Sequence, residues 1–233
     1  MIPLADHNIR RTVPVVTYLI IAANFAAFVY ELSLGDTLAH FIEVYGAVPT
    51  EITSGRGIPS GAPNPIYVTL LTSMFLHGGV LHIAGNMLYF WVFGDNVEDV
   101  MGHLGFLIFY VIVGLCASAA QILVDPASSI PSIGASGAIA GVLAAYLVLY
   151  PRQPVRTLVF FGFVWIANVS AFILIGFWFV AQFFHGLTSI VPGVRTAQDA
   201  GIAYWAHIGG FVAGLILVRL FAPRPRPAIY GGY

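Results

Sequence analysis

Two side chains of this chain could together carry out nucleophilic catalysis. Ser136 opens an apolar run within the segment Gly-Ala-Ser-Gly-Ala at 134–138, and His207 stands in a later apolar run. A neutral histidine is the side chain best suited near pH 7 to accept the proton of a serine hydroxyl and make it a nucleophile. Polar groups inside apolar segments are costly and tend to be functional. The sequence therefore predicts a serine–histidine dyad.

His82 and Asn86 could stabilise the negative charge that such a reaction develops. Their i, i+4 spacing places an imidazole and an amide on one face of a helix. Hydrogen-bond donors of this kind must be in place before the reaction. The backbone N–H groups at the start of the Ser136 helix would add donors and a favourable dipole. Because we find no carboxylate at the same depth, the sequence predicts a dyad and not a triad.

The composition places these residues in a membrane protein. Of 233 residues, 59% are hydrophobic and 8% are charged, whereas an ordinary soluble domain has roughly 25% charged residues. The formal net charge of −1 gives no reason to expect a nucleic acid partner. Cys116 is the single cysteine, so no intramolecular disulfide can form and we expect it to pack as a small apolar side chain.

Six apolar stretches are long enough to be candidate spans, since roughly 20 residues cross a hydrocarbon core of about 30 Å. They cover residues 13 to 33, 78 to 98, 104 to 124, 136 to 150, 157 to 185 and 203 to 221. The short connections at 99 to 103 and 151 to 156 predict tight antiparallel helix hairpins. The sequence thus predicts an all-α integral membrane bundle of six helices, with a membrane domain at 13–221 between tails at 1–12 and 222–233.

The arginines predict the orientation of this bundle, because the chain has no lysine. With the N-terminus in the cytoplasm, seven arginines lie inside and two outside, which agrees with the positive-inside rule. The inside set is Arg10, Arg11, Arg152, Arg156, Arg219, Arg224 and Arg226, and the outside set is Arg56 and Arg195. We therefore expect both termini in the cytoplasm, and the loop at 34–77 outside.

This orientation brings the polar residues to a common depth. Counting about 1.5 Å per residue from the charged inner ends of their helices puts all four side chains roughly 6 to 12 Å below the outer surface. The four are His82, Asn86, Ser136 and His207. A water-filled cavity open to the outside could reach that layer.

Three of these segments resemble motifs of the rhomboid family of intramembrane serine proteases. They are Gly-Ala-Ser-Gly at 134–137, His-Ile-Ala-Gly-Asn at 82–86 and Ala-His-Ile-Gly-Gly-Phe-Val-Ala-Gly at 206–214. The resemblance covers all six spans and implies a six-helix bundle that holds the dyad in a hydrated cavity. The implied activity is cleavage of transmembrane segments of other proteins near the outer leaflet.

The resemblance also implies roles for individual residues. Ser136 matches the family nucleophile, His207 its general base, and His82 with Asn86 its oxyanion donors. Gln121 resembles a position that retains water for hydrolysis. His77 matches a family histidine with a structural role in the outer loop. Further matches are Glu98, expected to cap or pair locally, and the small-residue faces Gly210/Gly214 and Gly137/Gly141, expected to let two helices approach closely.

Several positions depart from the family pattern or bear on substrate entry. Val68-Thr69 stands where many members carry Trp-Arg, so the outer loop must be anchored differently. Ala140 stands where an aromatic side chain often packs on the catalytic histidine, so another residue must orient His207. In this family substrate is thought to enter between the second and fifth helices, where Phe177 and Trp178 could line a lateral gate.

Two alternatives to a protease remain. One is a catalytically inactive relative that binds transmembrane clients, although such members typically lack the serine or the histidine. The other is a small transporter, which the absence of acidic residues deep in any span disfavours. A metal site at His77 and His82 lacks a third ligand. We expect no metal or cofactor, transmembrane protein substrates and a lipid bilayer as partners, and a bacterial inner membrane location with the site opening outward.

Overall fold

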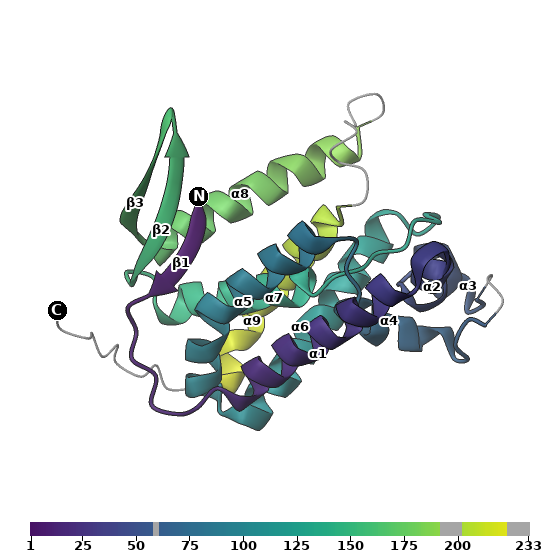
Figure 1. Ribbon diagram of the computed structural model, residues 1–233, viewed down its shortest axis with the longest axis horizontal. Helices are drawn as coiled ribbons and strands as arrows, with labels where there is room; N and C mark the ends of the chain where they lie inside the picture. Colours follow the sequence, from purple (N-terminus) through teal and green to yellow (C-terminus); the bar gives the residue numbers. More distant parts are fainter. Residues whose placement is uncertain (58–60, 192–201, 223–233) are drawn as a thin grey trace.

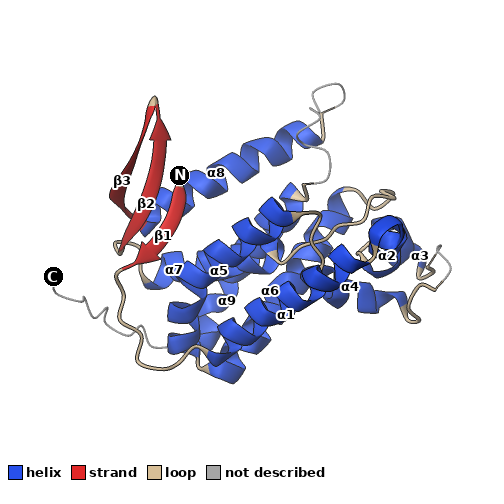
Figure 2. Ribbon diagram, in the orientation of Figure 1, coloured by secondary structure: helices blue, strands red, loops and turns tan. Residues whose placement is uncertain are grey.

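The chain folds into a bundle of long helices with a small β-sheet at one end (Figures 1 and 2). The computed structural model describes residues 1–57, 61–191 and 202–222, so the tail expected at 222–233 lies almost wholly outside the described residues. The long helices are α1 (Val15–Ser33), α5 (Val80–Met101), α6 (His103–Val124), α7 (Ser136–Leu149), α8 (Ala171–Ser189) and α9 (Tyr204–Phe221).

The connection between α1 and α5 is folded. It contains α2 (Leu38–Tyr45), α3 (Pro49–Ser54) and α4 (Thr69–Thr72), together with short 3-10 turns at Gly35–Thr37, Ile66–Val68 and Ser73–Phe75. We call the end of the bundle that carries α2 and α3 the loop end, and the opposite end, which carries the sheet, the sheet end (Figure 1).

The helices confirm the expected membrane character. Among the described residues, α1, α6, α8 and α9 are long and apolar enough to cross a bilayer. The segment Ile66–Phe75 together with α5 would make a fifth span, bent by 81°. Helix α7 is apolar but has only 14 residues. The structure is thus mostly helical with four to five candidate spans.

The span predicted at 157 to 185 is wrong. Residues there form β2 (Pro154–Phe161) and β3 (Phe163–Ser170), which pair antiparallel around Gly162, and α8 begins only at Ala171. The hairpin is rich in β-branched and aromatic residues, which favour strands, and Gly162 has the positive φ of +72° that a tight turn can require. Apolar composition alone could not separate these strands from the helix that follows. The connection predicted as a short one at 151 to 156 is wrong for the same reason.

A third strand shows that the all-α assignment is also wrong. β1 (Ile2–Asp6), in the segment expected to be a tail, pairs antiparallel with β2, so the sheet order is β1-β2-β3. Ile2 lies opposite Leu158 and Asp6 opposite Val155. The sheet stands beside the start of α8 (Figure 2). The N-terminal residues are therefore attached to the membrane bundle.

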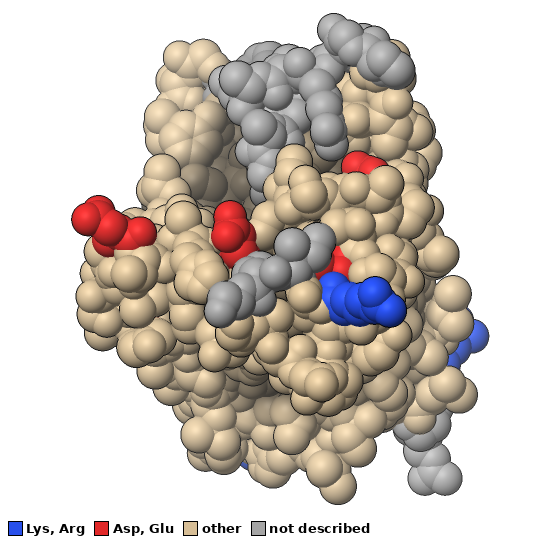
Figure 3. All heavy atoms as spheres, turned by 90° about the vertical axis from the view of Figure 1, so that its right-hand side faces the viewer, with Lys and Arg blue, Asp and Glu red and all other residues tan. Residues whose placement is uncertain are grey.

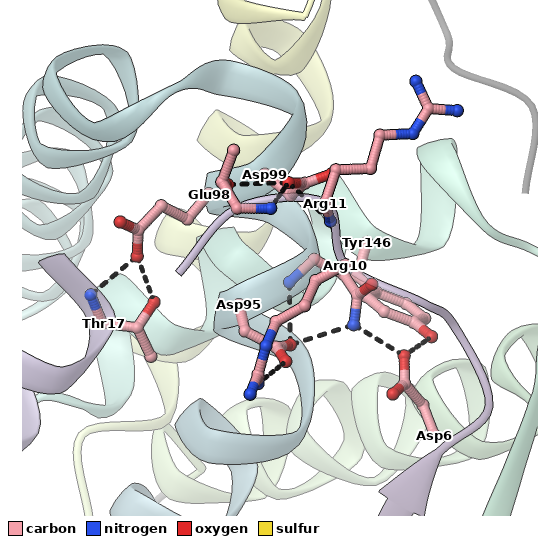
Figure 4. A network of polar contacts seen from close by, with 10 residues as sticks. Asp6, Arg10, Arg11, Thr17, Asp95, Glu98, Asp99 and Tyr146 are labelled. Carbon is pink, nitrogen blue, oxygen red and sulfur yellow. Dashed lines mark hydrogen bonds and ion pairs between the residues drawn. The ribbon is translucent and has the colours of Figure 1, made fainter. Parts of the chain in front are cut away.

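A network of carboxylates attaches the N-terminal segment to α5 at the sheet end (Figure 4). Buried Glu98 accepts hydrogen bonds from the N–H groups of Val16 and Thr17 at 2.9 and 2.7 Å and from the Thr17 hydroxyl at 2.6 Å. It also pairs with His103 at 2.6 Å. A carboxylate at a helix N-terminus satisfies free N–H groups and the helix dipole. The prediction that Glu98 caps or pairs locally is confirmed, and the helix that it caps is α1.

Helix α9 packs closely on α7 through glycines. A Cβ atom on Gly210 would collide with the backbone of Gly137, and one on Gly214 with the backbone of Gly141. The two helices therefore touch backbone to backbone, as the small-residue faces predicted. This contact brings the first turn of α9 beside the start of α7.

Candidate active site

Ser136 and His207 lie in direct contact. Ser136 is the first residue of α7, and His207 lies in the first turn of α9, both toward the loop end. The distance from Ser136 Oγ to His207 Nε2 is 2.7 Å, which is the distance of a hydrogen bond. A serine hydroxyl held at this distance from an imidazole nitrogen has the arrangement of a nucleophile with its base.

The pair opens into a cavity of about 830 Å³ between α5, α7, α8 and α9. His82 and Asn86 line the same cavity, so the structure brings together the four side chains that the sequence placed in one layer. Its wall is otherwise largely apolar or aromatic, with Tyr89, Trp178 and Tyr204 among the larger side chains. A concave, mostly apolar site with a few convergent polar groups is the usual form of a binding pocket.

The hydrogen bonds of His82 define which ring nitrogen can donate. The N–H of Gly78 donates to Nδ1 of His82 at 3.3 Å, so Nδ1 carries no proton and the neutral ring has its N–H at Nε2. That Nε2 faces the chain just before Ser136, because a Cβ atom on Gly134 would lie 2.9 Å from it and 3.5 Å from Ser136 Oγ. Gly134 also has a φ of +122°, so the position favours glycine twice over. His82 thus presents a donor beside Ser136.

Asn86 offers a second donor. The residue is only 8% exposed, and its Nδ2 makes no hydrogen bond within the described part of the chain. Buried amide groups in proteins are normally paired. Asn86 lines the cavity, so its unpaired amide is a candidate donor to an oxygen that a bound molecule would bring.

Gln182 on α8 is a residue of the site that sequence reasoning missed. Its Oε1 lies 2.7 Å from Nδ1 of His207, on the side of the ring opposite Ser136. The rings of Trp178 and Tyr204 lie with centroids 5.9 and 6.4 Å from that of His207. These contacts orient His207. They take the place of the aromatic side chain that would be expected at the position of Ala140. The sequence signal was an amide inside an apolar helix, which is costly without a role.

Gln121 does not reach this site. It lies near the end of α6, and its Oε1 is buried without a partner among the described residues. A small cavity of about 20 Å³ behind Ser136 is lined by Ser118 of the same helix and not by Gln121. The water-retention role of Gln121 stays a prediction.

His77 has contacts that agree with its expected structural role. It is buried, and its N–H donates to both carboxylate oxygens of Glu31 on α1, at 3.1 and 3.2 Å. Its ring packs edge-on against His82 at 5.0 Å. Glu31, which the sequence analysis did not single out, thus anchors the segment that leads into α5, and the His77 ring in that segment packs against His82.

The outer segment around Val68-Thr69 is anchored by hydroxyl groups. Thr69 is buried and donates to the carbonyl of Ile66 at 2.7 Å, while Val68 is exposed. Thr72 donates to the carbonyl of Tyr45 at 2.6 Å, which attaches α4 to the end of α2. These local hydrogen bonds anchor the segment that lacks the Trp-Arg pair.

Comparisons with known proteins agree on one family. The family model described as "Rhomboid domain" matches residues 65–224. Rhomboid-like protein 11, chloroplastic, of Arabidopsis thaliana is 26% identical over 87% of this chain and 67% of its own length. RHOMBOID-like protein 5 of the same plant is 27% identical over 96% of the chain and 74% of its length.

A bacterial relative is more similar over a shorter stretch. Rhomboid protease GluP of Bacillus subtilis is 36% identical over 58% of this chain, which corresponds to 24% of its own length. The match thus spans about a quarter of that protein. The three relatives named above come from a bacterium and a plant, and others are mitochondrial, so they do not indicate in which membrane this chain lies.

Proposed function

The chain belongs to the rhomboid family, and on this premise we propose that it is an intramembrane serine endopeptidase that cleaves transmembrane segments of other membrane proteins near the outer leaflet. The observation that carries the proposal is the 2.7 Å contact between Ser136 Oγ and His207 Nε2, inside a cavity within the helical bundle.

In the first half of the reaction, Ser136 Oγ attacks the substrate carbonyl carbon while His207 Nε2 accepts the hydroxyl proton. The tetrahedral intermediate then collapses, the C–N bond breaks, and His207 donates the proton to the leaving amine. In the second half a water molecule loses a proton to His207 and attacks the acyl-enzyme ester. Ser136 leaves with that proton, and the dyad is restored.

The oxyanion of both intermediates would lie between His82 and Asn86. His82 supplies the Nε2–H described above, and Asn86 supplies an amide donor with no other partner in the described part of the chain. Because both are fixed before substrate arrives, neither must reorganise as the charge develops, which is the condition for strong electrostatic stabilisation. The start of α7 adds the positive end of its dipole.

Substrate entry is proposed between α5 and α8. The outward face of α8 is exposed along its length, with Phe177 60% exposed, while the neighbouring Trp178 lines the cavity. A transmembrane substrate could therefore approach α8 from the lipid and extend past Trp178 toward Ser136.

We propose that all six long helices are membrane helices and that the sheet end faces the cytoplasm, with both termini. Most arginines of the described residues lie at that end: Arg10, Arg11, Arg152, Arg156 and Arg219. The loop end shows few, scattered charged side chains (Figure 3). This asymmetry agrees with the positive-inside rule. The active site then opens to the outer side of the membrane.

The test is cleavage of a transmembrane substrate by the full chain in liposomes, with Ser136→Ala as the comparison. We expect the variant to lose all cleavage, and unchanged cleavage would end the proposal. Labelling by a fluorophosphonate, which reacts with an activated serine, should vanish in both Ser136→Ala and His207→Ala. A wild-type chain that neither cleaves nor labels would favour the alternative, an inactive relative that binds transmembrane clients.

A further inference from the structure

We infer that Gln182 is a positioning residue that selects the catalytic tautomer of His207, as a neutral third member of the catalytic group. The inference rests on the proposed function, because it assigns a role toward a histidine that acts as a base. Its observations are the 2.7 Å contact of Gln182 Oε1 with His207 Nδ1 and the 2.7 Å contact of His207 Nε2 with Ser136 Oγ.

The chemistry of the partners determines where the protons lie in these two contacts. An amide oxygen has no proton, so in the contact with Gln182 the hydrogen must come from Nδ1 of His207. A neutral imidazole with its proton on Nδ1 has a lone pair on Nε2. That lone pair faces the hydroxyl of Ser136. The amide thus holds the ring in the one neutral form that can accept the serine proton.

The opposite tautomer would be inactive. With its proton on Nε2, His207 could only donate to Ser136, and it would lose its donor toward Gln182. In the Ser-His-Asp group an aspartate prevents this and also stabilises the imidazolium that forms. Among the described residues, no Asp or Glu lines this cavity. A neutral amide performs the orienting part alone, without the cost of a charge inside the membrane.

The surroundings of His207 restrict the ring further. Trp178, one turn before Gln182 on α8, and Tyr204 on α9 pack against it. The titratable side chains that share its cavity are His82 on α5, His185 on α8, and Tyr89 and Tyr204 on α5 and α9. The aromatic contacts restrict where the ring lies, but they do not distinguish its two nitrogens. Within the described part of the chain, the contact with Gln182 is the one that does so.

The experiment compares two substitutions of Gln182 in the full chain in liposomes. Gln182→Met keeps a similar unbranched volume and removes the acceptor, whereas Gln182→Glu returns an oxygen acceptor. Leu123→Met, on the exposed surface of α6 and outside the proposed entry route, is the control. The readouts are fluorophosphonate labelling rate, kcat and KM for a transmembrane substrate, the pH profile of labelling, and the melting temperature.

We expect Gln182→Met to lower kcat and the labelling rate roughly 10- to 100-fold, with KM and melting temperature nearly unchanged, because the base remains but loses its orientation. Gln182→Glu should recover most of the rate, and the acidic limb of its pH profile should move to higher pH, since a carboxylate favours the protonated ring. Leu123→Met should label like the wild type.

Three results would overturn the inference. One is a wild-type labelling rate in Gln182→Met. Another is a labelling rate that falls as far in Gln182→Glu as in Gln182→Met, while the acidic limb of the pH profile of Gln182→Glu stays where it is in the wild type. The third is a slower labelling rate in Gln182→Met that is accompanied by a raised KM and a lowered melting temperature, which would mark a purely structural role. A wild-type chain that fails to label at all would instead sink the proposed function, so the two failures are distinguishable.

Discussion

The carboxylates at the sheet end and Asn86 in the cavity wall differ in whether other described residues of the chain pair with them. At the sheet end, Asp6, Asp95, Glu98 and Asp99 each accept two or more hydrogen bonds from the chain itself (Figure 4). Toward the loop end, Asn86 is just as deeply placed, and its amide nitrogen has no partner within the described residues.

The difference predicts separate roles for these residues. A satisfied carboxylate attaches segments that are far apart in the sequence, as Glu98 does for α1. The unpaired amide of Asn86 carries a desolvation cost, and the residue lines the cavity, where an oxygen of a bound molecule could offset that cost. Removing a group should therefore cost stability at the sheet end and activity at the site. The following predictions test that separation.

The largest expected effect is on stability, in Glu98→Ala. The substitution leaves three donors at the start of α1 without their buried acceptor and removes the partner of the half-exposed His103 side chain. We expect a loss of about 4 kcal/mol in the free energy of unfolding, as for other broken buried charge networks. Titration with a denaturing detergent measures it. A loss below about 1 kcal/mol would show that the sheet end does not depend on this carboxylate.

The next effect is on activity, in Asn86→Ala. Loss of one oxyanion donor typically lowers kcat by about 10²- to 10³-fold. Stability should change little, because the amide nitrogen makes no hydrogen bond in the described part of the chain. Cleavage kinetics and detergent unfolding are measured on the same preparations.

The matched control lies ten residues along the same helix. Asn96 donates to Asp6 at 2.8 Å and to Asp95 at 2.9 Å. Asn96→Ala should therefore cost stability and leave kcat within about twofold, the reverse of Asn86→Ala. Equal activity losses in the two variants would contradict the separation.

A pH dependence should come from Asp6. Burial raises the pKa of its carboxyl from 3.8 to about 7, against the lowering effect of the Tyr146 hydrogen bond. The folded chain thus holds the proton more tightly than the unfolded chain does, so stability from this group falls as pH rises from about 4 to about 7. For one proton the slope is at most about 1.4 kcal/mol per pH unit.

Asp6→Asn tests this assignment, because asparagine cannot ionise. Unfolding free energies of the wild type and the variant, measured from pH 4 to pH 8, should converge toward low pH and diverge toward neutral pH, with the variant the less pH-dependent. Parallel curves would show that another group carries the dependence.

The smallest effect is expected for Arg10→Gln. Arg10 pairs with Asp95 at 3.1 Å, but its side chain is 45% exposed. Exposed ion pairs contribute about 0.2–1 kcal/mol and are screened by salt. We expect a loss of about 0.5 kcal/mol that disappears in high salt. A larger loss of stability that does not depend on salt would show that Arg10 is an integral part of the polar network at the sheet end and not an exposed member of it.

The sequence placed together four side chains that line one cavity in the structure, and it misread part of the fold. Ser136, His207, His82 and Asn86 stand at regular helical positions, so counting residues along helices was enough to place them together. The strands at 154–170 were missed because hydropathy measures apolar content and does not distinguish a strand from a helix. Gln182 was missed because its role depends on α8 meeting α9, a contact between helices that residue spacing within one helix does not contain.

The place of Gln182 on α8 has a consequence for timing. This helix is covered on one side only, since much of its other face is exposed along its length. A hydrogen bond tolerates a shift of only a few tenths of an ångström before it weakens. A small tilt of α8 away from α9 would therefore break the contact between Gln182 and His207 while the fold stayed the same. Under the proposed function, the helix over which substrate would enter would thus also control whether His207 can act as a base.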